Sequence, residues 1–214
     1  MSRRKRSHFS ANYSVERVKI KLIKKIVMAT NNENKLREVR EILQPLGIEV
    51  ISQKDAGADV QPEENGTTFE ENAFIKAQTV YDLTSWPVIA DDSGLCVEAL
   101  NGKPGVYSAR FAPKGKECEK LLEAMADVPE NKRQAYFQCD IAFINETFSE
   151  VFSGKCMGKI GYSEKGTNGF GYDPVFLYGD KTLAEMSSEE KNKISHRAEA
   201  LKKLYDFLKE RYCD

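Results

Sequence analysis

The sequence contains no long apolar run. No stretch of its 214 residues approaches the roughly 20 consecutive apolar residues that a membrane-spanning helix needs. The basic first residues also lack the apolar segment that marks a secretory signal. We therefore expect no membrane segment and no export signal.

Metal-binding cysteine and histidine motifs are absent as well. The five cysteines are widely spaced, no Cys-x-x-Cys pair occurs, and there are only two histidines. These absences argue against the usual zinc sites. An odd number of scattered cysteines favours free thiols over a disulfide framework, so we expect a reducing, cytoplasmic location.

Internal repeats, low-complexity tracts and linkers rich in Pro, Gly or Ser are also missing. Hydrophobic residues make up 41% of the chain and charged residues 30%. A chain of this length and composition is sufficient for one compact domain with its own core.

The charge is unevenly distributed. Residues 1–25 hold nine Lys or Arg and one Glu, a net +8, and the whole chain is −1, so the remainder carries −1 − 8 = −9. An acidic body argues against broad nucleic-acid binding. Residues 1–24 are predicted to be a disordered, dispensable basic extension, because they have little apolar surface to bury. The domain is predicted to span residues 25–214.

Alternating β-type and helical patterns predict the fold class. Apolar residues recur at strand spacing in some segments and at helical spacing in others, and Thr68 and Glu71 have the spacing of a capping box. The predicted strands are 24–30, 48–52, 88–90, 133–145 and 148–162, and the predicted helices are 35–46, 68–84, 115–128 and 195–208. We expect an α/β fold with an elongated mixed sheet flanked by helices, in which strands 133–145 and 148–162 pair as a hairpin.

Two adjacent carboxylates, Asp91 and Asp92, follow the apolar run at 88–90. Burying both without partners would be costly, and a divalent cation such as Mg²⁺ would relieve that cost. Because adjacent strand side chains point to opposite faces, we expect only one of them to face a site. The following Ser93-Gly94 pair predicts a turn.

Three other polar features are individually weak. The loop at 30–35 follows a strand and opens a helix, which favours anion binding, although Asn is also a common helix cap. It is not a P-loop. Glu63 and Glu64 fit a solvated acidic turn, and Asn72 and Lys76 fit an ordinary exposed helix face.

Two later segments indicate ligand binding. The glycine-dense stretch 166–176 contains Phe170 and Tyr172, either of which could stack on a flat ring. His196 and Arg197 stand at a predicted helix start, where positive charge opposes the helix dipole. A functional role for these two side chains is therefore favoured over a structural one.

Together these segments resemble the inosine triphosphate pyrophosphatase family, whose members hydrolyse noncanonical purine nucleotides. The resemblance runs from about Lys25 to the C-terminus and rests on residues 29–39, 63–77, 89–111, 166–176 and 195–204. The chain departs from the family at Asn31, where the family often has Gly. Asn tolerates the left-handed conformation better than most residues, so we expect the loop to form.

The resemblance implies a two-lobed domain around a central active-site cleft, Mg²⁺ as cofactor and a homodimer. It implies hydrolysis of dITP, ITP, XTP or dXTP to the monophosphate and pyrophosphate. Asp92 would be the general base and, with Glu63, would position Mg²⁺, although a carboxylate bound to Mg²⁺ is a weakened base. The implied substrate-binding residues are Thr30, Asn31, Asn32, Glu33, Asn34, Lys35, Lys76, Ser93, Phe170, Gly171, Tyr172, Asp173, Lys191, His196 and Arg197.

Two other functions remain open at the level of sequence. One is a related pyrophosphatase that prefers a pyrimidine or modified nucleotide, which a substrate panel would reveal. The other is a nonenzymatic protein that binds nucleic acid through its basic extension. Steeply salt-dependent binding without phosphate release would support the latter, but the acidic body argues against it.

Overall fold

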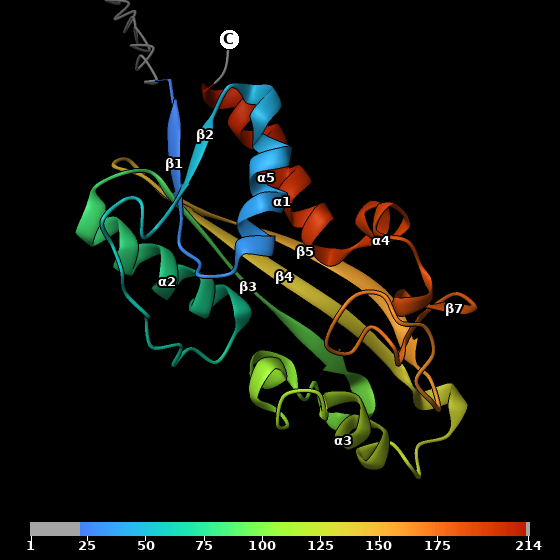
Figure 1. Ribbon diagram of the computed structural model, residues 1–214. Coiled ribbons are helices and arrows are strands. Elements are labelled where there is room, and N and C mark those ends of the chain that lie inside the picture. The colour runs from blue at the N-terminus through green and yellow to red at the C-terminus, as the bar shows by residue number, and fades with distance from the viewer. Residues whose placement is uncertain (1–21, 213–214) are drawn as a thin grey trace, which may run out of the picture.

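The protein is built on one mixed β-sheet, shown in Figure 1 for the computed structural model, which describes residues 22–212. The strand order is β2-β1-β3-β4-β5-β6-β7. The strands are β1 (Lys25–Met28), β2 (Glu49–Ser52), β3 (Val88–Val97), β4 (Gln134–Ile144), β5 (Ser149–Ile160), β6 (Phe176–Tyr178) and β7 (Lys181–Thr182). The helices are α1 (Glu33–Leu43), α2 (Phe69–Thr84), α3 (Glu117–Ala124), α4 (Ser188–Ile194) and α5 (His196–Tyr212).

The sheet combines a short parallel part with a long antiparallel part. β1 pairs in parallel with both β2 and β3, and all the later pairings are antiparallel. The long strands β3, β4 and β5 run diagonally through the molecule and connect its two halves (Figure 1). The predicted α/β class, elongated mixed sheet and β4–β5 hairpin are confirmed.

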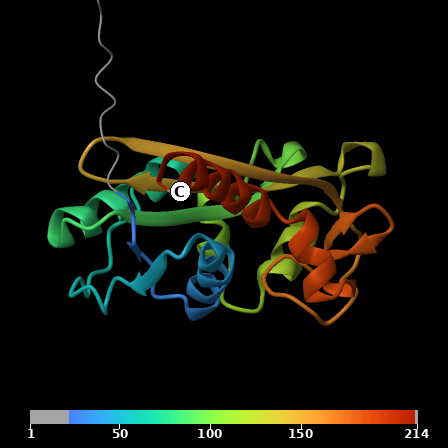
Figure 2. The ribbon, with the colours of Figure 1, turned by 90° about the horizontal axis from the view of Figure 1, so that it is seen from above.

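Helices cover both faces of the sheet around β1 and β3. α1 and α5 lie together on one face and α2 on the other (Figures 1 and 2). Leu36, Val39 and Leu204 belong to the apolar core on the α1/α5 side, whereas Ala73 and Ala77 belong to the core under α2. A third apolar cluster, which includes Leu121 of α3 and Phe176 of β6, forms the core of the other half. The first two clusters form the core of one expected lobe, and the third forms the core of the other.

The predicted turn at Ser93-Gly94 is wrong. β3 continues through both residues to Val97, and Gly94 pairs with Gln138 of β4. A Cβ atom on Gly94 would lie 2.6 Å from the carbonyl oxygen of Gly105 and 2.4 Å from the Ser108 hydroxyl. Glycine therefore permits a close backbone approach within a strand here, rather than a change of direction.

The domain packing begins before the predicted boundary at residue 25. Ile23 packs against the core on the α1/α5 side, and the Lys24 carbonyl accepts a hydrogen bond from the Glu49 backbone at 2.8 Å. The prediction for the basic extension otherwise falls on residues 1–21, outside the described residues.

Within residues 22–212, no helix has both the length and the apolar character needed to cross a membrane.

Candidate active site

A cleft of about 990 Å³ opens where the parallel strands end. Thr30 follows β1, Gln53 follows β2, and Asp91 lies within β3. The carboxyl ends of parallel strands are a common place for ligands in α/β proteins. The cleft is lined by Ala29, Thr30, Asn31, Asn32, Glu33, Lys35, Gln53, Val60, Gln61, Pro62, Glu63, Glu64, Lys76, Asp91 and Arg110.

The loop after β1 is shaped by its own polar side chains. The Thr30 hydroxyl accepts a hydrogen bond from the Asn32 backbone at 3.1 Å, and Asn32 Oδ1 accepts one from the Lys35 backbone at 3.3 Å. Asn32 therefore caps the start of α1, as its residue type predicts. Positive φ angles among the described non-glycine residues occur at Ser85 and Asn101, so Asn31 does not need the left-handed conformation that we expected.

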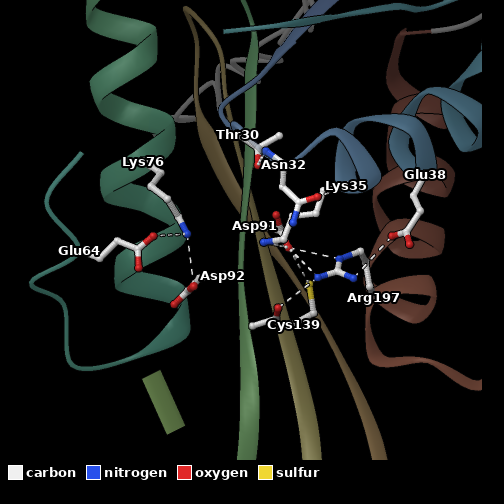
Figure 3. Close-up of polar contacts among 11 residues, drawn as sticks. Thr30, Asn32, Lys35, Glu38, Glu64, Lys76, Asp91, Asp92, Cys139 and Arg197 are labelled. Atoms are coloured by element: carbon white, nitrogen blue, oxygen red, sulfur yellow. Dashed lines mark hydrogen bonds and ion pairs between the residues drawn. The ribbon is translucent and has the colours of Figure 1, made fainter. Parts of the chain in front are cut away.

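Asp92 faces α2 and is held by two side chains of that helix. Its Oδ2 accepts a hydrogen bond from Asn72 Nδ2 at 3.2 Å, and its Oδ1 lies 3.3 Å from Lys76 Nζ. Lys76 also contacts Glu64 Oε1 at 2.9 Å (Figure 3). The capping box of Thr68 and Glu71 fixes the start of α2, and Asn72 and Lys76 then lie one turn apart on the same face.

The surroundings of Asp92 change its acid–base behaviour. Burial raises the pKa of Asp92 above its ordinary value, and the Lys76 ammonium only partly offsets this effect. Burial alone would lower the pKa of Lys76, but Asp92, Asp91 and Glu64 outweigh it and raise that pKa. Asp92 is thus a carboxylate with increased proton affinity beside a lysine that stays charged.

Asp91 points to the opposite face of β3 and is paired with cations there. Its Oδ2 lies 2.9 Å from Lys35 Nζ and 3.3 Å from Arg197 Nε. Arg197 also donates to the Ser93 hydroxyl at 3.2 Å and contacts Glu38 Oε2 at 3.5 Å. Figure 3 shows the strand standing between this cluster and the Asp92–Lys76–Glu64 cluster. The expectation that the two carboxylates face opposite sides is confirmed.

Asp91 is ionised because of these partners. Burial alone would raise its pKa, but Lys35, Arg197 and Lys76 outweigh burial and hold the pKa well below its usual range. Arg197, also buried, keeps its charge because Asp91 raises its pKa. Asp91 therefore fixes two cations at one edge of the cleft.

The glycine-rich loop at 166–176 lies outside the cleft lining, in the lobe whose core contains Leu121 and Phe176. Phe170 is 67% exposed, whereas the Tyr172 side chain is buried in the core and donates its hydroxyl hydrogen to the Ser108 carbonyl at 2.9 Å. Of the two rings, Phe170 is therefore the one that a flat ligand can reach. Asp173 accepts from the Phe170 backbone and pairs with Lys191, whose Nζ lies 4.7 Å from the Phe170 ring centre.

His196 is a buried, neutral side chain at the start of α5. Its ring stacks on Phe137 at 5.0 Å between ring centres. Burial, with Arg197 and Lys191 nearby, lowers its pKa to about 3. A neutral imidazole avoids the unfavourable interaction with the helix dipole that the sequence suggested.

The structure brings together only part of the predicted site. Thr30, Asn31, Asn32, Glu33, Lys35, Glu63 and Lys76 line the cleft. Asp92 adjoins it through Lys76, and Arg197 adjoins it through Asp91. Ser93 in turn contacts Arg197. Phe170, Gly171, Tyr172, Asp173, Lys191 and His196 lie outside its lining. The Asn34 side chain is outside the described part of the structure.

Sequence reasoning missed several residues of the site. Asn72 is fully buried against Asp92, although its position was interpreted as an exposed helix face. Glu64 contacts Lys76, whereas its neighbour Glu63 is exposed on the cleft wall. Gln53 could have been found, because it is a polar residue directly after a strand parallel to β1. Nothing in the sequence alone distinguishes Glu64 from Glu63.

Comparison with known proteins gives consistent results. The chain is 50% identical over 193 residues to a dITP/XTP pyrophosphatase from Bacillus licheniformis, covering 87% of this chain and 98% of that one. A Ham1 protein of Staphylococcus aureus superposes with a TM-score of 0.81 at 41% identity, covering 87% of this chain and 99% of that one. A HAM1 protein from Coxiella burnetii gives a TM-score of 0.83 at 40% identity, covering 88% and 100%.

The family model for Ham1 proteins matches residues 26–207, a range that contains the cleft, both carboxylate clusters and the glycine-rich loop. The chain belongs to the Ham1 family.

Proposed function

We propose that this protein hydrolyses noncanonical purine nucleoside triphosphates, namely dITP, ITP, XTP and dXTP, to the monophosphate and pyrophosphate. The observation that carries the proposal is the juxtaposition of Asp92, a carboxylate of raised pKa, with Lys76 at a cleft that also contains Lys35. The 50% identity to a protein named dITP/XTP pyrophosphatase supports the choice of substrate.

In this proposal Asp92 is the general base. Its raised pKa makes it a better proton acceptor than an exposed aspartate. Its two oxygens are held by Asn72 and Lys76, which fixes the direction of the carboxylate. Asp92 would take the proton of a water that attacks the phosphorus bonded to the nucleoside oxygen.

The lysines supply the positive charge that a triphosphate requires. Lys76 and Lys35 line the same cleft from α2 and α1, on opposite sides of β3. Charge builds on the bridging oxygen and on pyrophosphate as the bond breaks, and fixed cations in a partly desolvated cleft stabilise that charge. Thr30, Asn31, Asn32 and Glu33 would complete the phosphate-binding loop.

The donor set fits Mg²⁺. The carboxylates of Asp92 and Glu64 already flank a positive charge, the Lys76 ammonium, at 3.3 and 2.9 Å. Among the described residues, no group of three or more His, Cys, Asp or Glu side chains could hold a metal. Mg²⁺ commonly takes one or two carboxylates plus waters and substrate phosphates, and it would neutralise phosphate oxygens when bound. Asp92 with Glu63 or Glu64 would hold it.

We assign recognition of the nucleotide's purine ring to residues outside the cleft lining. Phe170 offers an exposed ring for stacking, and Lys191, His196 and Arg197 lie on the α4–α5 segment beyond it. Hypoxanthine and xanthine carry a carbonyl at C6 where adenine has an amino group. Donors directed at that oxygen would be left unpaired against ATP, a mismatch worth about 10⁴-fold in discrimination.

The proposal is tested with a nucleotide panel. Pyrophosphate release is measured from dITP, XTP, dGTP, dATP and dCTP, each with Mg²⁺ and with a chelator. The expected result is turnover of dITP and XTP far above the others, and only with the metal. A preference for dCTP would replace the proposal with the pyrimidine alternative, and no release from any nucleotide would reject an enzymatic role.

Lys76→Met should change both substrate binding and pH dependence. The substitution removes a phosphate partner, so KM for dITP should rise. It also removes the cation that lowers the pKa of Asp92, so the acid limb of the pH–rate profile should move to higher pH. The profile of kcat/KM from pH 5 to 9 checks both effects. An unchanged KM and acid limb would exclude Lys76 from phosphate binding and from setting the pKa of Asp92. Lys202→Met on the exposed face of α5 is the control.

Removal of residues 1–21 should leave the enzyme intact. A chain that starts at Leu22, with an added Met, retains Ile23 and the Lys24 carbonyl, which contact the domain. We expect an unchanged melting temperature and unchanged kcat/KM for dITP. Severe loss of activity in the folded, shortened protein would mean that the basic segment contributes to the cleft or to an interface.

A homodimer and a cytoplasmic location complete the proposal. Exposed apolar side chains such as Phe74 and Met157 are candidates for the dimer interface. The free thiols of Cys96, Cys118 and Cys139 suit a reducing compartment. Light scattering after gel filtration tests the dimer, and a monomer at micromolar concentration would reject it.

A further inference from the structure

Gln53 is a buried amide that joins two walls of the cleft. It is 2% exposed and directly follows β2. Its Nε2 donates to the Val60 carbonyl at 2.8 Å and to Asn31 Oδ1 at 3.0 Å. The first contact holds the segment that leads to Glu64, and the second holds the loop that follows β1.

These two contacts determine which way the Asn31 amide faces. A backbone carbonyl can only accept hydrogen bonds, so the end of Gln53 beside Val60 must be its NH₂ group. That nitrogen has two hydrogens, and the second is donated to Asn31, so the acceptor must be the Asn31 side-chain oxygen. The opposite end of the Asn31 side chain, Nδ2, is therefore left as a hydrogen-bond donor. No residue of the described chain accepts from it, and Asn31 lines the cleft.

The backbone offers no other reason for an asparagine at this position. Asn31 is absent from the described non-glycine residues that have positive φ, so its tolerance of the left-handed conformation is not used. The Asn32 side chain, not that of Asn31, accepts from the first turn of α1. What remains specific to Asn31 is its side-chain amide.

We propose that Gln53 is a positioning residue that turns the Asn31 amide so that its NH₂ group faces an oxyanion in the cleft. The inference rests on the proposed function, in which that oxyanion is a phosphate oxygen of the triphosphate. A fixed NH₂ group donates to an anion and repels a cation, so Asn31 acts with Lys35 on the phosphate and is not a metal ligand.

Asn31→Asp tests the sign of this assignment. The new carboxylate can still accept from Gln53 Nε2, but its second oxygen replaces the donor that faces the cleft. The probe is inorganic tripolyphosphate, titrated by calorimetry in metal-free buffer. Asn31→Ala should weaken binding about tenfold, the loss of one hydrogen bond to a charged group. Asn31→Asp should weaken it about a hundredfold, because charge repulsion is added to that loss.

A double-mutant cycle tests the role of Gln53. Gln53→Met has a similar shape but no donors, so it frees the Asn31 amide and should weaken tripolyphosphate binding several-fold. In an Asn31→Ala background the same substitution should have a much smaller effect, because Gln53 has no amide left to position. Any loosening of the Val60 segment would appear equally in both backgrounds. Gln78→Met is the matched control, since the Gln78 side chain is half-buried on α2 and donates to Asp82 of the same helix. We expect it to change nothing.

Kinetics provide a second measurement. In both Gln53→Met and Asn31→Ala, KM for dITP should rise more than kcat falls, since the lost contact is made to the bound triphosphate. A general structural role would instead lower the melting temperature and kcat together.

The outcomes separate the inference from the proposed function. Tighter or unchanged tripolyphosphate binding in Asn31→Asp, additive effects in the cycle, or no binding by the unaltered protein would each overturn the inference even if dITP is hydrolysed. The expected order of affinities without hydrolysis of any nucleotide would uphold the inference about an anion site and reject the proposed enzyme.

Discussion

Asp92→Asn should lower the turnover of dITP at least about 10²-fold, the scale of a lost general acid–base group. The substitution keeps the shape of the side chain, and the amide oxygen can still accept a hydrogen bond from Asn72 or Lys76. It removes the negative charge that would accept the proton of water and help to hold Mg²⁺. Because the packing is preserved, the melting temperature should change little compared with the loss of turnover.

The measurement is kcat at saturating dITP and Mg²⁺, with a thermal melt of the same sample. Asp82→Asn is the matched control, since Asp82 is exposed on α2 and its side chain accepts from Gln78 of the same helix. If a folded Asp92→Asn protein keeps full turnover, the assignment of the site is lost. If the control loses as much activity, the effect is not specific to Asp92.

Asp91→Asn should instead act mainly on stability. Asp91 is a buried carboxylate in contact with Lys35 and Arg197. Removing one partner of a buried ion pair leaves uncompensated charge and costs about 3 kcal/mol or more in the free energy of unfolding. The Asp206→Asn control breaks an exposed pair with Lys202 on α5 and should cost less than about 1 kcal/mol.

The pH dependence of stability gives the same prediction an independent check. The pKa of Asp91 is lowered in the folded protein, so its stabilisation is fully present above the ordinary value of 3.8 and is lost as the pH falls below it. The free energy of unfolding of the unaltered protein, measured in urea, should therefore fall from pH 5 to pH 3. Asp91→Asn should lack this part of the decline. Parallel curves for the two proteins would contradict the ion-pair account.

The fold was predictable where local patterns are strong. The capping box at Thr68, the apolar face of α1 and the β4–β5 hairpin all agree with their sequence signals. The error at Ser93-Gly94 has a tertiary cause. Glycine is needed at position 94 because the backbone at Gly105 approaches too closely for a Cβ atom. That contact forms only on folding, so the local sequence pattern does not reveal it.

The site was predictable to the extent that its residues follow strand ends. The loop at 30–35 and the Asp91–Asp92 pair were found from their positions beside apolar strands. The different roles of the two aspartates depend on Lys76 of α2 and on Lys35 and Arg197, which three separate helices bring to β3. Sequence spacing predicts that the aspartates point apart, but not which partners each one meets.

The central claim is that this cleft cleaves a nucleoside triphosphate between its first and second phosphates. It is tested most directly by identifying the products of dITP with ³¹P NMR in the presence of Mg²⁺. The account predicts dIMP and pyrophosphate in equal amounts, with no dIDP and no orthophosphate. The appearance of dIDP with orthophosphate, or no consumption of dITP, would contradict it.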